Sequence, residues 1–584
     1  MTFIGSLSGG SSAGGTSSSG QITYTPGSGI SGLASGIDTD AMVNAMVQSA
    51  QVPLVQLLQQ RQILQWQEMR YQQVNASLTQ LQNTVQSMQL QSTFMQHSVT
   101  SSDSTVVSGT AGTLAPNGTY SVTVQQLAQG AMVYSSSPIS TDPNYPSNTT
   151  LSSLGYSSGV TLTVNGQSFT FQGSDTLQTV LSQINGNTSA GVSTFYDANS
   201  GNVVMQTTAT GTNAKIQVDD TTAAFFQTAF NINISSTNPP TGQNAQFTVN
   251  GYSTTSQTNQ VNYNGLTLNL YATTSSPVTV TVGVDVDAIV NSIENFVQQY
   301  NQTLQLMQGL YNEQRNYDYQ PLTTQQAAQM TQDQIEKWNE QAQSGMLAND
   351  PLLGSIMNTM EDDMQLQVSG QTQSTVNGQQ VTLNSLAAIG ITPIDPMNGV
   401  SSGAEAPGVT TTGWNTYGLL QIDPDQLRAA IQADPQAVMR LFTNNPQFSS
   451  GSGMGTGIAV QLNNDLTNAI QQLTDEAGTN PDIDSEIQTK SSNGTTIAGA
   501  GLLPYTLIDP NADFSTLFGT DSLDVSFLGQ QISSMDTNAE DMQQQISDLQ
   551  QRYQNEFSQM EQALAQLSSQ SSYLSSMMGS SSSA

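Results

Sequence analysis

Residues 527–557 of this 584-residue chain read FLGQQISSMDTNAEDMQQQISDLQQRYQNEF. Apolar side chains in this segment recur at alternating spacings of four and three residues: Leu528, Ile532, Met535, Ala539, Met542, Ile546, Leu549 and Tyr553. Such spacing is typical of a helix that packs lengthwise against another helix. The two steps of four that lead to Phe557 form a stutter, after which a second phase continues through Met560, Leu564 and Leu567. We expect a long C-terminal helix whose apolar row contacts other helices.

A second heptad row lies near the other end of the chain, at Tyr71, Val74, Leu78, Leu81, Val85 and Met88. Asp38 is the expected N-cap of the preceding helical segment, and Pro53 is expected to interrupt it. The pattern predicts a long helix from Gln56 to His97, with His97 at the end where the helix dipole favours a cation. Because both terminal helices are amphipathic, the sequence predicts that they pack together.

Between these helices, from Ser98 to about Val284, the pattern indicates β-structure. The tetrapeptide Thr-Val-Asn-Gly occurs at 163–166, 248–251 and 375–378, and each copy predicts a type I′ hairpin turn. The clearest unit has strands at 160–164, 169–171, 192–196 and 203–206 around one helix. We expect Ser174 to cap this helix, whose apolar face is Leu177, Val180, Leu181 and Ile184.

The expected fold class is α+β and multidomain: long coiled-coil terminal helices packed together, with β-rich domains inserted between them. A helical pattern resumes at Ile289, which supports the insertion. The expected domains are a disordered lead and first helical segment (1–55), the long N-terminal helix (56–98), a first β-rich domain (99–140 and 235–284), a second β-rich domain (141–234), the rest of the helical stalk with a short β insert (285–530) and the C-terminal coiled-coil helix (531–584).

Composition limits the classes of function. Only 9% of residues are charged, and 42 acidic against 9 basic residues give a net charge of −33, which opposes binding to nucleic acid and anionic membranes. No cysteine and a single histidine leave no basis for thiol catalysis or multi-histidine metal sites, so we expect no cofactor and no metal. No apolar run is long enough to span a membrane, and the first 20 residues lack the features of a cleavable signal peptide.

Three patterns could carry chemistry, and each has a simpler interpretation. Gly27–Gly32 fits a dinucleotide fingerprint but is followed by a helical pattern, as a flexible lead-in would be. Gly155–Gly159 fits a nucleophile elbow, but the one histidine precedes it, which favours a turn. Asp423 with Asp425, or the acidic run 361–363, could supply paired carboxylates, although acids are also common at solvated helix starts. We therefore expect no enzyme.

Several segments, in order along the chain, resemble one known family. They are ISGLASGIDTD at 30–40, GTYSVTVQQLA at 118–128, FVQQYN at 296–301, GMLAND at 345–350, LAAIGI at 386–391, IDPDQL at 422–427, DPQAVMRLF at 434–442 and the segment 557–574. Together they resemble the flagellar hook-associated protein 2 family, the flagellar filament cap proteins. The unit at 160–206 is similar to the repeat module of flagellins and hook-associated proteins.

The resemblance implies a structural protein at the distal end of the bacterial flagellar filament, where a homo-oligomeric ring, most often a pentamer, promotes folding and polymerisation of exported flagellin. Its implied partners are flagellin, the hook-filament junction protein, the flagellar type III export apparatus and an export chaperone. The implied location is extracellular. The resemblance transfers no catalytic residue. The oligomer or filament contacts would come from the C-terminal row, namely Met542, Ile546, Leu549, Tyr553, Phe557, Met560, Leu564 and Leu567.

Two alternatives stay open at this stage. The first is a hook-filament junction protein or flagellin-like axial subunit, which would share the helical ends. The second, from a different class, is a leaderless secreted adhesin or surface enzyme. The scarcity of lysine and arginine also suggests an acidic medium, because few ion pairs exist to be broken by acid. Neutral surfaces are common in exported filament proteins regardless of habitat, so the composition is compatible with either environment.

Overall fold

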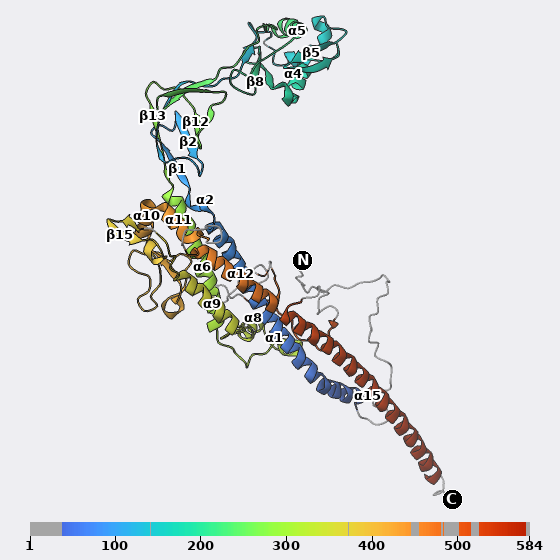
Figure 1. Cartoon of the computed structure of the whole chain (residues 1–584). Coiled ribbons are helices and arrows are strands. Elements are labelled where there is room, and N and C mark those ends of the chain that lie inside the picture. Colours follow the sequence, from blue (N-terminus) through green and yellow to red (C-terminus); the bar gives the residue numbers. More distant parts are fainter. Residues whose placement is uncertain are drawn as a thin grey trace.

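The computed structural model describes residues 38–140, 142–371, 373–445, 455–480, 483, 502–514 and 525–579. The lead-in at 1–29 and the Gly27–Gly32 pattern lie outside these residues, as does most of the motif at 30–40. Figure 1 shows a long helical body with two β-rich domains projecting beyond one end and a single helix running out at the other. The α+β multidomain fold class is therefore confirmed.

The N-terminal helix α1 (Thr39–Met88) is continuous over 50 residues, about 75 Å at 1.5 Å per residue. Asp38 caps it as predicted, since its side chain accepts a hydrogen bond of 2.9 Å from the N–H of Ala41. The expected interruption at Pro53 is wrong, because α1 continues through it. Burial of the neighbouring Leu54 and Leu58 offsets the hydrogen bond that proline removes.

The predicted end of this helix at His97 is also wrong. The chain leaves α1 after Met88, forms the short α2 (Gln91–Phe94) and enters β1 (His97–Ser101), so that His97 begins a strand. The buried ring of Phe94 stacks on Phe442 with 5.3 Å between ring centroids. Burial of this aromatic ring in the core stabilises the fold, which explains why α1 ends at Met88 although no proline or glycine follows there.

The helical body has one large apolar core. All six positions of the predicted row on α1, from Tyr71 to Met88, are buried in it. The helical pattern that resumes at Ile289 corresponds to α6 (Val286–Asn312), where Ile289, Phe296 and Met307 are buried in the same core. The other helices of this body are α7 (Thr324–Ala327), α8 (Gln332–Ala342), α9 (Pro351–Met364), α10 (Pro424–Ala433), α11 (Pro435–Thr443) and α12 (Ile458–Ala477). Two antiparallel strand pairs complete it: β14 (Gln373–Val376) with β15 (Gln379–Thr382), and β16 (Ile391–Pro393) with β17 (Leu420–Ile422).

The first β-rich domain contains two antiparallel sheets around their own core. The five-stranded sheet has the order β1-β13-β3-β9-β10, and the three-stranded sheet has the order β11-β12-β2. Their strands are β2 (Val107–Ala111), β3 (Gly118–Gln126), β9 (Ala245–Val249), β10 (Tyr252–Ser256), β11 (Gln260–Tyr263), β12 (Leu266–Leu270) and β13 (Val278–Val284). The pairing of β1 with β13 brings both connections to the helical body together.

The second β-rich domain is inserted between β3 and β9, with a separate core. It contains β4 (Met132–Tyr134), α3 (Tyr145–Asn148), β5 (Val160–Val164), β6 (Gln167–Phe171), α4 (Leu177–Gly186), β7 (Val192–Asp197), β8 (Asn202–Thr207) and α5 (Asp220–Phe230). The apolar face predicted for α4 is buried. Its cap is Thr176 and not Ser174: the Thr176 hydroxyl accepts from the N–H of Thr179 at 3.2 Å, two residues beyond the predicted cap.

The C-terminal helix α15 (Phe527–Gly579) spans 53 residues and is unbroken at the predicted stutter. It packs against α1, which confirms that the terminal helices lie together, and it continues past the start of α1 to Gly579 (Figure 1). The three Thr-Val-Asn-Gly copies are hairpin turns as predicted, with both central residues at positive φ.

Candidate assembly interface

The terminal helices pair through a small apolar cluster of their own, which we call the Leu54 cluster. Leu54 and Leu58 of α1 are buried together with Ala539 of α15, and Ile508 and Phe514 close the cluster from the preceding loop. Met542 and Ile546, two of the residues predicted to contact other chains, pack against this cluster while half-buried. Part of the predicted row therefore contacts its own chain.

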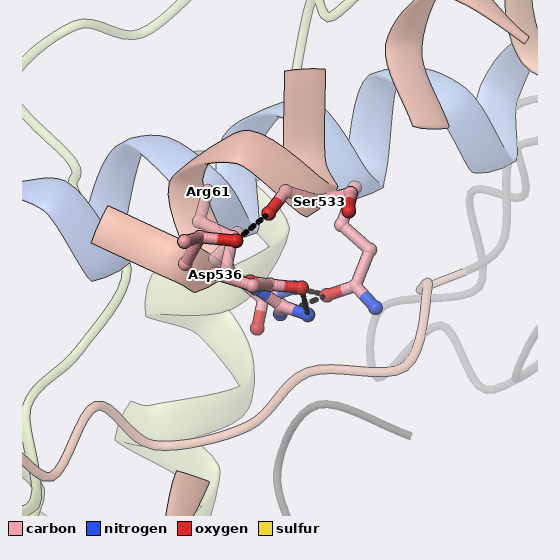
Figure 2. Close-up of polar contacts among 6 residues, drawn as sticks. Arg61, Ser533 and Asp536 are labelled. Atoms are coloured by element: carbon pink, nitrogen blue, oxygen red, sulfur yellow. Dashed lines mark hydrogen bonds and ion pairs between the residues drawn. The ribbon is translucent and has the colours of Figure 1, made fainter. Parts of the chain in front are cut away.

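An ion pair fixes the position of the two helices along each other. Figure 2 shows Arg61 reaching from α1 to Asp536 of α15, with Ser533 one turn earlier on the same helix. The Arg61 guanidinium makes two hydrogen bonds to the carboxylate, one of them 3.2 Å long from Nη2 to Oδ2. Its Nη1 lies 3.4 Å from Oε1 of Gln65. Because the two side chains are only 12% and 20% exposed, water screens this pair less than a surface pair.

Glutamine amides supply further contacts between α15, α1 and the loop before α15. Nε2 of Gln543 donates to the carbonyl oxygens of Pro510 and Ala512 at 3.3 and 2.8 Å. Gln51 of α1 donates to Asn511 at 2.7 Å. Hydrogen bonds of neutral amides therefore join both helices to this loop.

Farther along α15, the end of the predicted row is more exposed than its start. Leu549, Tyr553 and Phe557 are half-buried, Leu564 is half-buried, and Met560 and Leu567 are 38% and 60% exposed. We call residues 560–576 the distal segment; beyond Leu564 each of its side chains is exposed. Tyr573 and Leu574 are 65% and 58% exposed there. The structure thus divides the eight predicted contact residues into a proximal group that packs within the chain and a distal group that remains open to a partner.

Sequence reasoning missed Arg61, Asp536 and the Leu54 cluster. A usable signal was present, since Arg61 is one of only two basic residues in α1, and α15 carries six acidic residues that could pair with it. It also missed Trp66, a fully buried residue of α1 whose Nε1–H donates to the carbonyl of Pro504 at 2.9 Å. Trp66 fastens the segment that leads into α15 against α1.

The carboxylates that could have supplied catalytic chemistry lie at a helix cap and in a largely buried position on a helix. Asp423 caps α10, accepting from the N–H groups of Asp425 and Gln426 at 3.1 and 3.0 Å. In the acidic run on α9, burial raises the pKa of Asp363 to about 7, and the neighbouring Asp465 of α12 adds to the shift. Within the described ranges, no three histidine, aspartate or glutamate side chains are grouped as metal ligands would be. The nucleophile-elbow pattern forms turns, with Gly155 and Gly159 at positive φ.

None of the described helices is both long enough and apolar enough to cross a membrane.

The candidate site is the surface of the distal segment, supported by the paired part of α1 and α15. Beyond Glu561 its side chains are apolar or neutral, which suits contact with other helices more than binding of a charged ligand.

Comparison with known proteins gives consistent results. Two family models match: the flagellar hook-associated protein 2 N-terminus over residues 35–131 and its C-terminus over residues 242–569. Flagellar hook-associated protein 2 of Halalkalibacterium halodurans is 27% identical over 573 residues, covering 93% of this chain and 98% of that protein. The protein of the same name from Thermotoga maritima is 26% identical over 292 residues, covering 49% and 41%.

Among solved structures, the D1-D2-D3 domains of the flagellar cap protein FliD from Escherichia coli align with 22% identity and a TM-score of 0.46, covering 70% of this chain and 99% of that chain. FliD (HAP2) from Pseudomonas aeruginosa PAO1 aligns with 23% identity and a TM-score of 0.24, covering 34% and 92%. The family models together span most of the sequence on both sides of the second β-rich domain. The chain belongs to the flagellar hook-associated protein 2 family.

Proposed function

We propose that this protein caps the distal end of the bacterial flagellar filament, as a homo-oligomeric ring under which exported flagellin folds and polymerises. The observation that carries this proposal is the distal segment, an amphipathic helix with exposed Leu567, Tyr573 and Leu574, in a chain of this family. Among the residues that the structure describes, these apolar side chains are exposed, and an exposed apolar row of this kind is typical of a surface that binds a partner in an assembly.

The architecture supports a division of roles between the two ends of the molecule. The terminal helices extend from one end and would face the filament, while the β-rich domains project from the other (Figure 1). The cores of the β-rich domains are separate from the core of the helical body, so each can hold its shape while the helices change partners. This arrangement fits a structural protein.

The proposal includes specific partners and a location. These are other copies of the chain, most often five in the ring, flagellin, the hook-filament junction protein, the type III export apparatus and an export chaperone. The location is the extracellular filament tip. A hook-filament junction protein is not favoured, because both family models that match describe hook-associated protein 2.

Deletion of the gene in its motile host tests the function directly. We expect cells with hooks, no filaments and monomeric flagellin in the medium, and we expect the full chain supplied in trans to restore filaments. Filaments of normal length on the deletion strain would refute the cap function. Loss of hooks together with filaments would instead point to an earlier axial component.

A further inference from the structure

The three Thr-Val-Asn-Gly copies form a matched set of hairpin turns. Asn165, Asn250 and Asn377 have φ of 48°, 49° and 49°, and the glycines that follow have φ of 79°, 82° and 79°. Residue type and backbone geometry are thus the same across the set, as a type I′ turn requires. What differs is how the fold holds each asparagine side chain.

Asparagine followed by glycine can react with its own backbone. The nitrogen of the glycine, after losing its proton to solvent base, attacks Cγ of asparagine, and the new C–N bond closes a five-membered succinimide. The bond from Cγ to Nδ2 breaks, and ammonia leaves with a proton from water. A water molecule then opens the ring at either carbonyl, giving aspartate or isoaspartate. Ring closure needs the side chain to rotate over the following peptide nitrogen, so contacts that hold the side chain or the turn slow the reaction.

We propose that Asn377 is a site of spontaneous deamidation, and that it converts faster than Asn250 and much faster than Asn165. The two slower asparagines are held by named hydrogen bonds, and Asn377 is exposed at the tip of a hairpin of two four-residue strands.

Asn165 is held at both ends of its side-chain amide. Its Nδ2–H donates to the carbonyl of Ala190 at 2.8 Å, and its Oδ1 accepts from the N–H of Gln217 at 2.8 Å. The turn itself is anchored as well, since the backbone N–H of Asn165 donates to the carbonyl of Gln217 at 2.8 Å. The side chain is only partly exposed. Three contacts must therefore break before the ring can close.

Asn250 is held by one neighbour. Its Oδ1 accepts from the N–H of Ser121 at 2.8 Å, and its own backbone N–H donates to the carbonyl of Ser121 at 2.8 Å. These bonds tie the turn between β9 and β10 to the middle of the five-stranded sheet. Its amide nitrogen has no such anchor among the described residues, so we place Asn250 between the other two.

Asn377 lacks these restraints. Among the residues that the structure describes, its side chain makes no hydrogen bond, and Asn377 and Gly378 are both exposed. Its hairpin, β14 with β15, is a separate two-stranded sheet, and small isolated hairpins open at low cost in free energy. The interior of the hairpin is anchored below the tip, where Val376 is buried and Ser374 donates to Asp434 at 3.1 Å, so the tip can open while the helical body stays folded.

Conversion would change the hairpin in two ways. Either product puts a carboxylate on a tip that was neutral. The isoaspartate product also adds a backbone carbon between Val376 and Gly378, which is incompatible with the pairing of Val376 with Gln379. The reaction would therefore alter one surface hairpin of the helical body and leave its core intact.

The test is peptide mapping by mass spectrometry of the full-length protein, incubated in mildly alkaline buffer and sampled over time. Deamidation is followed by the mass gained when an amide NH₂ becomes a hydroxyl, and isoaspartate by chromatographic separation. We expect conversion at Asn377 to be at least about tenfold faster than at Asn165, with Asn250 intermediate. The same protein in concentrated urea is the reference, and there the three sites should react at similar rates. Asn377→Gly keeps a residue suited to the turn and should remove the signal at this site while leaving those of Asn165 and Asn250 unchanged.

Two results would overturn the proposal. One is conversion of Asn165 in the folded protein as fast as that of Asn377. The other is the same spread of rates in urea as in the folded state, since flanking sequence and not the fold would then set the order.

Discussion

Arg61 on α1 and Asp536 on α15 are 475 positions apart in the chain and form a doubly hydrogen-bonded ion pair at the junction of the two terminal helices. The pair lies beside the Leu54 cluster and determines how far one helix is displaced along the other. In a chain with 9 basic residues, one of them is used to align the two ends of the sequence.

Removal of this pair should loosen the terminal helices. We expect Arg61→Ala to lower the free energy of unfolding by about 1–3 kcal/mol, because it leaves a largely buried carboxylate without its charged donor. Urea denaturation monitored by circular dichroism measures the loss. Arg552→Ala is the matched control: its partner Glu556 is 3.9 Å away and both side chains are over 60% exposed, so we expect a change within about 0.5 kcal/mol. Equal losses in the two variants would contradict an aligning role for Arg61.

The distal segment should be needed for assembly and not for folding. Leu567→Asp places a charge where the side chain is already exposed, so we expect the melting temperature of the monomer to change little. In the assembled cap the same carboxylate would face apolar neighbours, at a cost of several kcal/mol, and filament formation should fail. Gln566→Asp adds the same charge one position away and should be tolerated. Motility assays and electron microscopy of complemented cells decide, and normal filaments with Leu567→Asp would remove the distal segment from the interface.

The β-rich domains should fold without the terminal helices. Their two apolar cores are made only of residues between 99 and 284. We therefore expect residues 99–284, expressed alone, to keep their β circular dichroism signal and protected amides in hydrogen exchange. A disordered spectrum from this fragment would show that the helical body is needed for their folding.

Acid should stabilise the helical body down to about pH 4. Burial raises the pKa of Glu294, Glu313, Glu361, Asp363 and Glu476, with Asp363 reaching about 7. The folded state binds these protons more tightly than the unfolded chain, so the free energy of unfolding increases as pH falls from above 7 towards the ordinary aspartate pKa of 3.8. Hydrogen bonds lower the pKa of exposed carboxylates such as Asp197 and Asp395 instead. Protonation of these groups lowers the free energy of unfolding only at still lower pH.

Thermal melts between pH 8 and pH 3.5 test this expectation. Asp363→Asn should stabilise the protein at pH 8 by about 1–3 kcal/mol and flatten the pH dependence, because it removes a buried charge. Asp541→Asn, at an exposed position of α15, should leave the dependence unchanged. A melting temperature that falls steadily from pH 7 to pH 4.5 would contradict the prediction.

Local patterns in the sequence were sufficient to predict many elements. The heptad row from Tyr71 to Met88 is buried, and the repeated tetrapeptides form turns, because these features depend on spacing and on glycine within a few residues. The insertion of β-structure between helical segments was predicted from the return of helical spacing at Ile289.

The errors share a cause in long-range packing. The early end of α1 depends on Phe94 meeting Phe442, which is 348 positions away, and continuity through Pro53 depends on contacts with α15. For the candidate interface, the heptad row was predicted, but the row alone could not show that Met542 and Ile546 pack within the chain while Leu567 is exposed. That distinction is set by where α1 begins relative to α15.

The amide contacts around α15 affect the range of salt concentrations over which the terminal helices stay paired. Dissolved salt shields charges from each other but acts weakly on hydrogen bonds between neutral amides and carbonyls, such as those from Gln543 to Pro510 and Ala512. High salt would weaken the ion pair of Arg61 with Asp536, but this pair is largely shielded from solvent. A bacterium that passes between dilute and saline water would therefore carry terminal helices that stay joined in both.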